Sequence, residues 1–273
     1  MVSRLGSHTR RTSWVRYRSV LATTILTTRQ IRSAWVSFWP MGSDAQPPTP
    51  LKVIVLGCDH DVGCSIADGL SGAGWTVRRL DATAARTQAA GRADLGSIVT
   101  ELGGLDALVV ASWNPALTTP KPVESITDAD ITEGWEASMQ TLIWSLQASF
   151  PALSESKGRV AVVLPTTAMS GGSHYSLAAA SFEAQRILMK ATARQWGPGG
   201  VRLNAIAIAP ESVLDDAAVS DVHYLAPAAL GEDRSEEQRS LDLVRAVAFL
   251  IGEQSSGLTG QTVGVDGGRW LAP

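Results

Sequence analysis

The chain has 273 residues, of which 45% are hydrophobic and 18% are charged. This composition suits one large α/β domain or two small ones, and it excludes a disordered, collagen-like or disulfide-rich protein. The charge is unevenly divided, because residues 1–43 contain seven arginines and no acidic residue. The rest of the chain holds the other 16 of the 23 basic residues and all 26 acidic ones, so nucleic acid is not expected as its partner.

Residues 1–50 are expected to form a basic extension and linker ahead of a folded domain over residues 51–273. The extension is rich in Arg, Ser and Thr, which is typical of an organelle transit peptide. A basic arm for nucleic acid is a second interpretation. We favour a third, in which translation starts near Met41, because the body has the Arg, Ala and Gly content of a GC-rich bacterial gene. No apolar run approaches the 18 residues of a membrane span, so no membrane partner is expected.

Short apolar runs alternate with helix-like segments along the body. Strands are predicted at 52–57, 75–80, 105–111, 159–164, 201–207 and 261–265, and helices at 62–73, 131–153, 175–196 and 235–251. Because the strands are apolar on both faces, they indicate a single α/β domain with a doubly wound parallel sheet between two helical layers. Cys58 and Cys64 match no zinc or thioredoxin spacing, so we interpret them as reduced, partly buried residues of a cytoplasmic protein.

Four segments carry a resemblance to a known family. They are residues 158–163 (GRVAVV), residues 200–205 (GVRLNA), residues 258–268 (LTGQTVGVDGG) and Tyr175 at the start of an Ala-rich helix. Over residues 51–268 the chain resembles the short-chain dehydrogenase/reductase family. The resemblance implies a three-layer Rossmann-type sheet, NAD or NADP as cofactor, hydride transfer to a carbonyl or alcohol, and association into dimers or tetramers. Residues 82–104 are too few for the family's full set of elements, so the region around its third strand is expected to be shortened, with residues 93–95 as a remnant of that strand.

The resemblance places the cofactor's pyrophosphate at the glycine-rich turn after the first strand. Gly57 and Gly63 keep two of the family's glycines, but Asp61 replaces the central one and Asp59 adds a second acid. A carboxylate repels a phosphate at this distance, and Asp61 is also a good helix cap. We therefore favour a capped helix that binds no phosphate over a rearranged but working dinucleotide site. His60 between two acids suggests a metal ligand, but a solvated histidine is favoured and no metal is expected.

Two further positions bear on the cofactor. Asp81 ends the second strand, where an acid in the family binds the adenosine ribose and favours NAD; an ordinary polar strand end is the other interpretation. Arg78 and Arg79 leave NADP possible. Trp113 stands where the family has a glycine that packs against the cofactor, so its side chain is expected to fill cofactor space.

The family's catalytic set is incomplete. Tyr175 matches the acid/base tyrosine, but Ala179 stands where the family has the lysine that lowers the tyrosine pKa. Thr166 and Thr167 follow the position of the family's serine, and Ser138 aligns with its helix asparagine. For Tyr175 we favour an aromatic that packs at a helix start over a catalytic group.

Two functions of different class follow. The favoured one is a non-catalytic or weakly catalytic subunit that associates, through the helices at 131–153 and 175–196, with itself or with an active subunit of the family. The alternative is an active NAD(P)-dependent dehydrogenase or reductase of a carbonyl or alcohol, using Tyr175 with Thr166 or Thr167 in a rearranged site. Chemistry other than redox on the same fold is less favoured. Residues 211–234, the substrate lid of the family, carry no recognisable pocket signature.

Overall fold

Six strands form one parallel sheet in the order β2-β1-β3-β4-β5-β6. The computed structural model describes residues 50–82, 88–214, 228–231 and 234–271, so the expectations for residues 1–49 and for most of the lid lie outside it. The strands are β1 Lys52–Leu56, β2 Thr76–Leu80, β3 Ala107–Val110, β4 Arg159–Pro165, β5 Arg202–Ile208 and β6 Thr262–Val265. Every predicted strand is confirmed to within two residues at each end.

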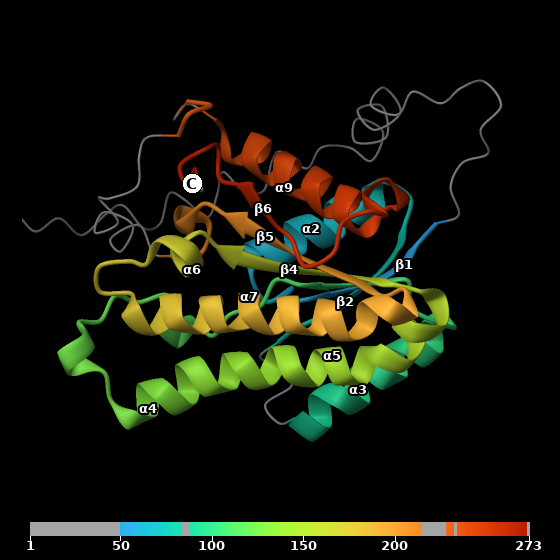
Figure 1. Ribbon diagram of the computed structural model, residues 1–273, viewed down its shortest axis with the longest axis horizontal. Coiled ribbons are helices and arrows are strands. Elements are labelled where there is room, and N and C mark those ends of the chain that lie inside the picture. Colours follow the sequence, from blue (N-terminus) through green and yellow to red (C-terminus); the bar gives the residue numbers. More distant parts are fainter. Residues whose placement is uncertain (1–49, 83–87, 215–227, 232–233, 272–273) are drawn as a thin grey trace, which may run out of the picture. The chain divides into compact units, whose positions relative to one another are not determined.

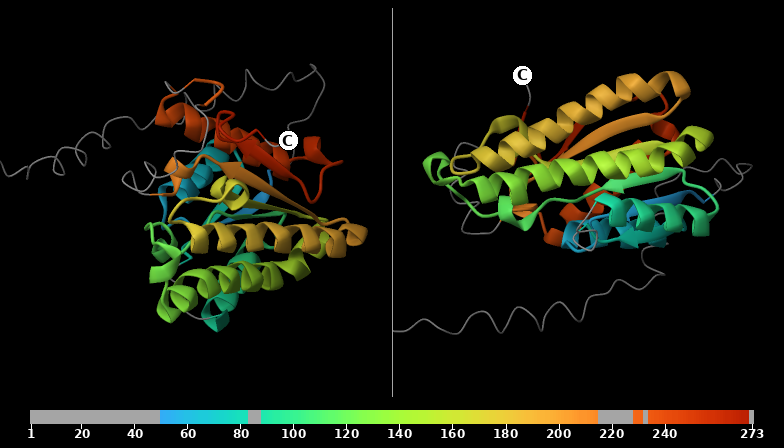
Figure 2. Two further views of the ribbon diagram at one scale, coloured as in Figure 1. Left: turned by 60° about the vertical axis from the view of Figure 1, so that its left-hand side comes forward. Right: turned by 90° about the horizontal axis from the view of Figure 1, so that it is seen from below.

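Helices cover both faces of the sheet. The longer ones are α2 Asp61–Gly72, α3 Gln88–Leu102, α5 Ala137–Ser156, α7 Ser176–Trp196 and α9 Glu236–Ile251. Figure 1 shows α3, α5 and α7 below the sheet and α2 and α9 above it, and the view from below in Figure 2 shows α3, α5 and α7 side by side. The predicted three-layer Rossmann-type fold is therefore confirmed.

Short elements complete the connections. They are α4 Asp128–Asp130, a π-helical segment Ile131–Glu136, α6 Thr167–Ser170, and 3₁₀ turns at Pro115–Leu117, Val123–Ser125, Gly197–Gly199, Pro210–Ser212 and Glu253–Ser255. The π-helical segment leads directly into α5, so the helix predicted at 131–153 is present but begins with a wider turn. Among the described helices none has the length and apolar character needed to cross a membrane.

The connection from β2 to β3 corrects one prediction. Residues 93–95 lie inside α3, so their assignment as a remnant strand is wrong. Leu95 is fully buried, and α3 packs along α5. One helix is enough to cross between two parallel strands, so the shortened region keeps its crossover and forms no strand beyond β2 in the part of the chain that is described.

The sheet forms the centre of the core. All residues of β3 and β4 are buried, as expected for strands covered on both faces. Asn204 in β5 links this core to the segment before β6, because its Nδ2 donates to the carbonyl of Leu258 at 3.0 Å and its Oδ1 accepts from the amide of Gln261 at 3.0 Å. Asn204 therefore has a structural role, holding β5 to the segment that leads into β6.

Candidate functional site

The carboxyl ends of the parallel strands meet at one edge of the sheet, where doubly wound folds bind their ligands. The arrowheads of β4 and β5 in Figure 1 point toward this edge. Gly57, Asp81 and Thr166 follow β1, β2 and β4 directly. The fold therefore brings these three predicted site residues to the same edge.

The two retained glycines make close backbone contacts. Gly57 has a φ of +105°, and a Cβ there would lie 2.0 Å from the carbonyl oxygen of Ala111 at the end of β3. A Cβ on Gly63 would lie 2.1 Å from the carbonyl oxygen of Gly57. Since these approaches involve only the chain's own backbone, packing of the β1–α2 turn is enough to require both glycines.

The start of α2 differs from our prediction. The residue before the first helical turn is His60, with extended backbone (φ −124°, ψ 150°), and no side chain caps the helix there. Asp61 is the first helical residue, so the prediction that it caps the helix is wrong by one position. Asp61 nevertheless places an exposed acid in the first turn, while Asp59 accepts a hydrogen bond from the amide of Ala82, after β2, at 3.2 Å.

An aromatic pair lies at the same helix start. The rings of His60 and Trp113 are stacked, with centroids 5.2 Å apart and 19° between their planes. Nε2 of His60 lies 3.1 Å from the carbonyl oxygen of Trp113, and because that oxygen only accepts, the imidazole donates. Trp113 is only 4% exposed. The indole therefore lies against the turn at which the family binds pyrophosphate.

The thiols of Cys58 and Cys64, beside this turn, are expected to be poor nucleophiles. Both are free thiols and partly buried, as predicted. Burial raises the pKa of Cys58 to about 11, and burial also raises the pKa of Cys64. Because thiolate is the nucleophilic form, neither thiol is poised for covalent chemistry at neutral pH.

Two threonine hydroxyls lie buried between β4 and α6. Thr166 and Thr167 are both fully buried, and the amide of Thr166 donates to the carbonyl of Ile208 at 2.8 Å. Within the described part of the chain, neither hydroxyl has a hydrogen-bond partner. An unpartnered buried hydroxyl costs free energy, so this pair is an unusual feature of the site.

Tyr175 and Ser138 have different surroundings. Tyr175 precedes the first turn of α7 and is 2% exposed. One turn along α7, Ala179 offers no amine to its hydroxyl. The hydroxyl of Ser138 donates to the carbonyl of Gly134 at 2.7 Å and accepts from the amide of Asn114 at 3.4 Å. Ser138 therefore joins the π-helical segment to the loop after β3 through backbone contacts.

The sequence did not predict one ion pair that lies at this edge. Glu211, after β5, pairs with Arg269, after β6, at 2.9 Å, and each side chain is about one-fifth exposed. Glu211 and Arg269 lie 58 positions apart, so no local motif in the sequence links them. Among the residues that the structure describes, no group of three or more His, Cys, Asp or Glu side chains could hold a metal ion.

Comparison with known proteins agrees with this geometry. Residues 60–269 match the family model described as enoyl-(acyl carrier protein) reductase. The chain is 29% identical to 4-formylbenzenesulfonate dehydrogenase of Comamonas testosteroni over 189 residues, covering 65% of this chain and 72% of the relative. It is 26% identical to 7alpha-hydroxysteroid dehydrogenase of Bacteroides fragilis over 229 residues (80% and 84%), and 25% identical to diacetyl reductase [(S)-acetoin forming] of Staphylococcus aureus over 167 residues (57% and 65%). With its parallel sheet and this match over most of its length, the chain belongs to the short-chain dehydrogenase/reductase family.

Proposed function

We propose that this chain is a non-catalytic or weakly catalytic member of its family, which associates with itself or with an active subunit of the same family. The observation that carries the proposal is the stacked pair of His60 and Trp113 at the start of α2. In the family this helix end receives the pyrophosphate of NAD(P), because its free amides and positive dipole attract an anion. Here the chain's own side chains lie against it.

The residues of the turn do not fit a dinucleotide in this conformation. The glycine that would let the pyrophosphate approach is Asp61, and a second acid, Asp59, lies two residues before it. Two unit charges of the same sign 4 Å apart repel by about 1 kcal/mol even in bulk water. Gly57 and Gly63 do not argue for a cofactor, because backbone contacts account for both.

The incomplete catalytic set also supports a non-catalytic or weakly catalytic protein. The family's tyrosine depends on a lysine amine one turn along the helix, and this chain has Ala179 there. An acid/base group is most effective when its pKa lies near the working pH, and a tyrosine hydroxyl without such help titrates near pH 10. A packing role as a buried aromatic residue at the start of α7 is therefore enough to explain why the chain has a tyrosine at position 175.

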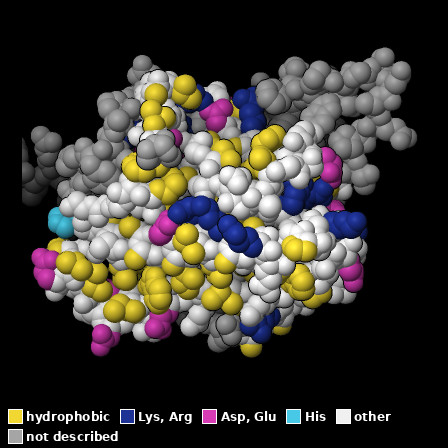
Figure 3. All heavy atoms as spheres, viewed as in Figure 1, with side chains coloured by type: hydrophobic (Ala, Val, Ile, Leu, Met, Phe, Trp, Pro, Cys, Tyr) yellow, Lys and Arg dark blue, Asp and Glu magenta, His cyan; other side chains and the backbone are white. Residues whose placement is uncertain are grey.

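A surface for association lies on α5 and α7, the two helices that pair subunits in the family. Figure 3 shows hydrophobic side chains gathered over the half of the molecule that these helices occupy. Phe150 of α5 is 38% exposed and packs on Trp196 of α7, with ring centroids 4.6 Å apart, and Ile187 of α7 is 50% exposed.

We place the protein in the cytoplasm, on the ground that both described cysteines are free.

Titration with NADH and with NADPH tests the proposal, with energy transfer from the nine tryptophans as the readout. We expect no saturable binding in the low micromolar range. The double variant Asp61→Gly, Trp113→Gly restores both glycines and should bind more tightly than the wild type, provided that circular dichroism shows it folded. Lys190→Gln, which changes neither the turn nor Trp113, is the control. Low-micromolar binding by the wild type would refute the proposal.

A second candidate is an active NAD(P)-dependent oxidoreductase of a carbonyl or alcohol, with Asp81 favouring NAD. The buried hydroxyls of Thr166 and Thr167, which lack partners among the described residues, favour it, as do relatives named as dehydrogenases and reductases. It requires Trp113 to leave the turn. A hundredfold loss of carbonyl reduction in Tyr175→Phe or Thr166→Val would support it, whereas we expect Tyr175→Phe to change no activity of this chain.

A further inference from the structure

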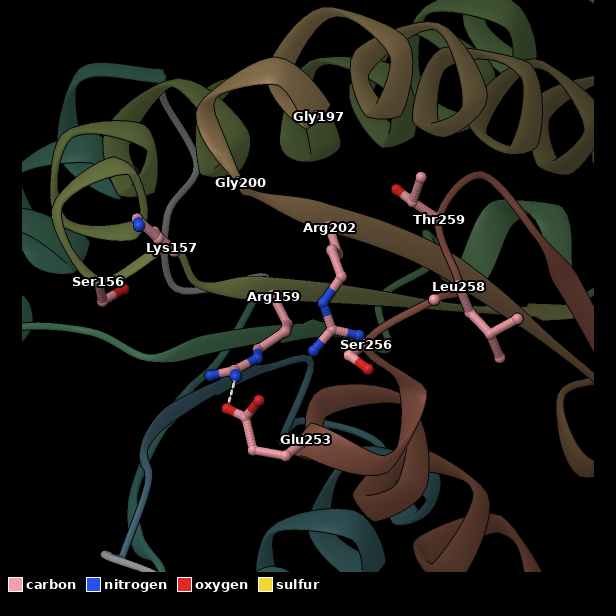
Figure 4. Close-up of a pocket in the computed structure, with 11 residues that line it drawn as sticks. Ser156, Lys157, Arg159, Gly197, Gly200, Arg202, Glu253, Ser256, Leu258 and Thr259 are labelled. Carbon is pink, nitrogen blue, oxygen red and sulfur yellow. Dashed lines mark hydrogen bonds and ion pairs between the residues drawn. The ribbon is translucent and has the colours of Figure 1, made fainter.

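A pocket of about 510 Å³ opens at the amino ends of β4 and β5, the opposite edge of the sheet from the predicted cofactor site. Figure 4 shows it between the end of α5, the turn after α7 and the segment that leads into β6. Three of its lining side chains are basic, Lys157, Arg159 and Arg202, and one is acidic, Glu253. The pocket therefore gathers positive charge in a part of the chain where acidic residues outnumber basic ones.

Two of these cations are neighbours in the sheet. Arg159 and Arg202 are the first residues of β4 and β5 and are paired in the parallel register. Paired residues of adjacent parallel strands project to the same face, and the strands are about 4.8 Å apart, so the two guanidinium groups repel each other. Figure 4 shows both groups directed into the same space. Burial lowers the pKa of each. The charge of Asp106 opposes this effect at Arg159, and the charge of Arg159 lowers the pKa of Arg202 further.

The chain neutralises this pair only in part. Arg202 donates to the carbonyl and to the hydroxyl of Ser255, the latter at 2.7 Å, and to the carbonyl of Gly252 at 3.1 Å, all of which are neutral acceptors. Arg159 pairs with Glu253, whose side chain is 76% exposed. The side chain of Arg159 is itself nine-tenths buried, and its Nε has no hydrogen-bond partner in the described structure.

Lys157 adds a third positive charge. It ends α5 with a left-handed backbone (φ 52°), and its side-chain carbons lie against Gly200, where a Cβ would come within 3.2–3.3 Å of them. In the described part of the chain its amine has no hydrogen bond or ion pair. It therefore lines the wall of the pocket as an available cation.

We propose that this pocket binds a phosphate group, and that Glu253 competes with that group for Arg159. A guanidinium fork such as that of Arg159 matches the oxygens of a phosphate in geometry as well as charge, and the nearby charges of Arg202 and Lys157 add to the attraction. An exposed carboxylate on a short turn can leave Arg159 when a better acceptor arrives. The proposal does not depend on the proposed function, since it concerns the other edge of the sheet.

Calorimetric titration at constant ionic strength tests the site, with inorganic phosphate and glycerol 3-phosphate as separate probes. Glu253→Gln removes the competing carboxylate and should tighten binding. Lys157→Gln removes an exposed charge and should weaken binding about two- to fivefold. Glu101→Gln and Lys190→Gln are the matched controls, because their side chains do not line the pocket, and they should bind like the wild type.

The two probes separate the sources of the phosphate group. Binding of both shows that the group alone is recognised, and binding of glycerol 3-phosphate alone assigns the site to phosphate monoesters; either supports the proposal when Lys157→Gln weakens it. The proposal is overturned if wild type and Glu253→Gln both show no saturable heat with either probe up to about 10 mM, a range that includes weak binding sites. Equal affinities of Lys157→Gln and Lys190→Gln would overturn it too.

Discussion

The imidazole of His60 stacks on the indole of Trp113 and donates to its backbone carbonyl, so two loops that follow β1 and β3 are joined by a ring contact and a hydrogen bond. The resemblance to the family places the cofactor against both loops. In this structure the two loops contact each other directly. Its contribution to stability can therefore be measured without any ligand.

Trp113→Ala should lower the free energy of unfolding by about 3–5 kcal/mol, because it removes a large buried ring and leaves a cavity. Denaturant titration measures the loss. Trp196→Ala serves as the comparison, since Trp196 is partly exposed and also stacks on one aromatic ring. If Trp196→Ala costs more than Trp113→Ala, the buried stack is not a main contact of the fold.

Gly63→Ala should destabilise the protein by at least 1–3 kcal/mol, roughly the cost of overpacking, because the new Cβ would lie 2.1 Å from the carbonyl oxygen of Gly57. Gly96→Ala is the matched control, since Gly96 is also helical and has open space at its Cβ position. That change should stabilise by about 0.5–1 kcal/mol. The measurement uses protein free of nucleotide. A neutral Gly63→Ala would mean that this glycine is not required for packing.

Alkaline pH should weaken the fold through Cys58. Burial raises its pKa from an ordinary 9.0 to about 11, so the unfolded chain loses the thiol proton at a lower pH than the folded chain does. The stabilisation is complete below pH 9.0 and is lost as the pH rises toward 11. Urea unfolding across this window should therefore show falling stability, with a shallower fall in Cys58→Ser. Equal slopes in the two proteins would contradict the assignment to Cys58.

Charge on the exposed apolar face of α5 and α7 should prevent association. Ile187→Glu and Phe150→Glu each place a carboxylate in the proposed interface, and burying an unpaired charge is unfavourable. Light scattering coupled to size exclusion should show a lower mass for both than for the wild type. Val123→Glu changes an apolar residue that is more exposed than either and lies outside both helices, and it should leave the mass unchanged. A wild-type oligomer that persists in both variants would exclude this face as the interface.

The sequence predicts the sheet closely because its strands are short apolar runs with clear ends. Prediction from sequence is weaker where contacts with neighbouring elements determine the local conformation. Residues 93–95 are predicted as a strand remnant, but they lie in α3, which buries Leu95 and packs along α5. The N-cap of α2 is His60 and not the predicted Asp61, because the extended backbone that precedes the helix falls on His60. Composition alone does not reveal this position.

The sequence identified individual residues of the candidate site but not the long-range contacts between them. Local sequence indicated that Asp61, Trp113 and Ala179 depart from the family pattern, since each occupies a motif position. The contact of Trp113 with His60 joins residues 53 positions apart, and the pair of Glu211 with Arg269 joins the ends of two strands. Such contacts depend on the register of the sheet, which no single segment specifies.

Because the sheet has no strand beyond β2 in the described chain, β2 is an edge strand there. A free edge offers unpaired backbone groups to other chains, which is a common route to aggregation. Two adjacent residues of β2, Arg78 and Arg79, are exposed, and Arg79 forms an ion pair with Asp68 of α2. A second copy that docked its own β2 alongside would bring four guanidinium groups together. The arginines of this strand thus disfavour pairing of two copies through the β2 edge.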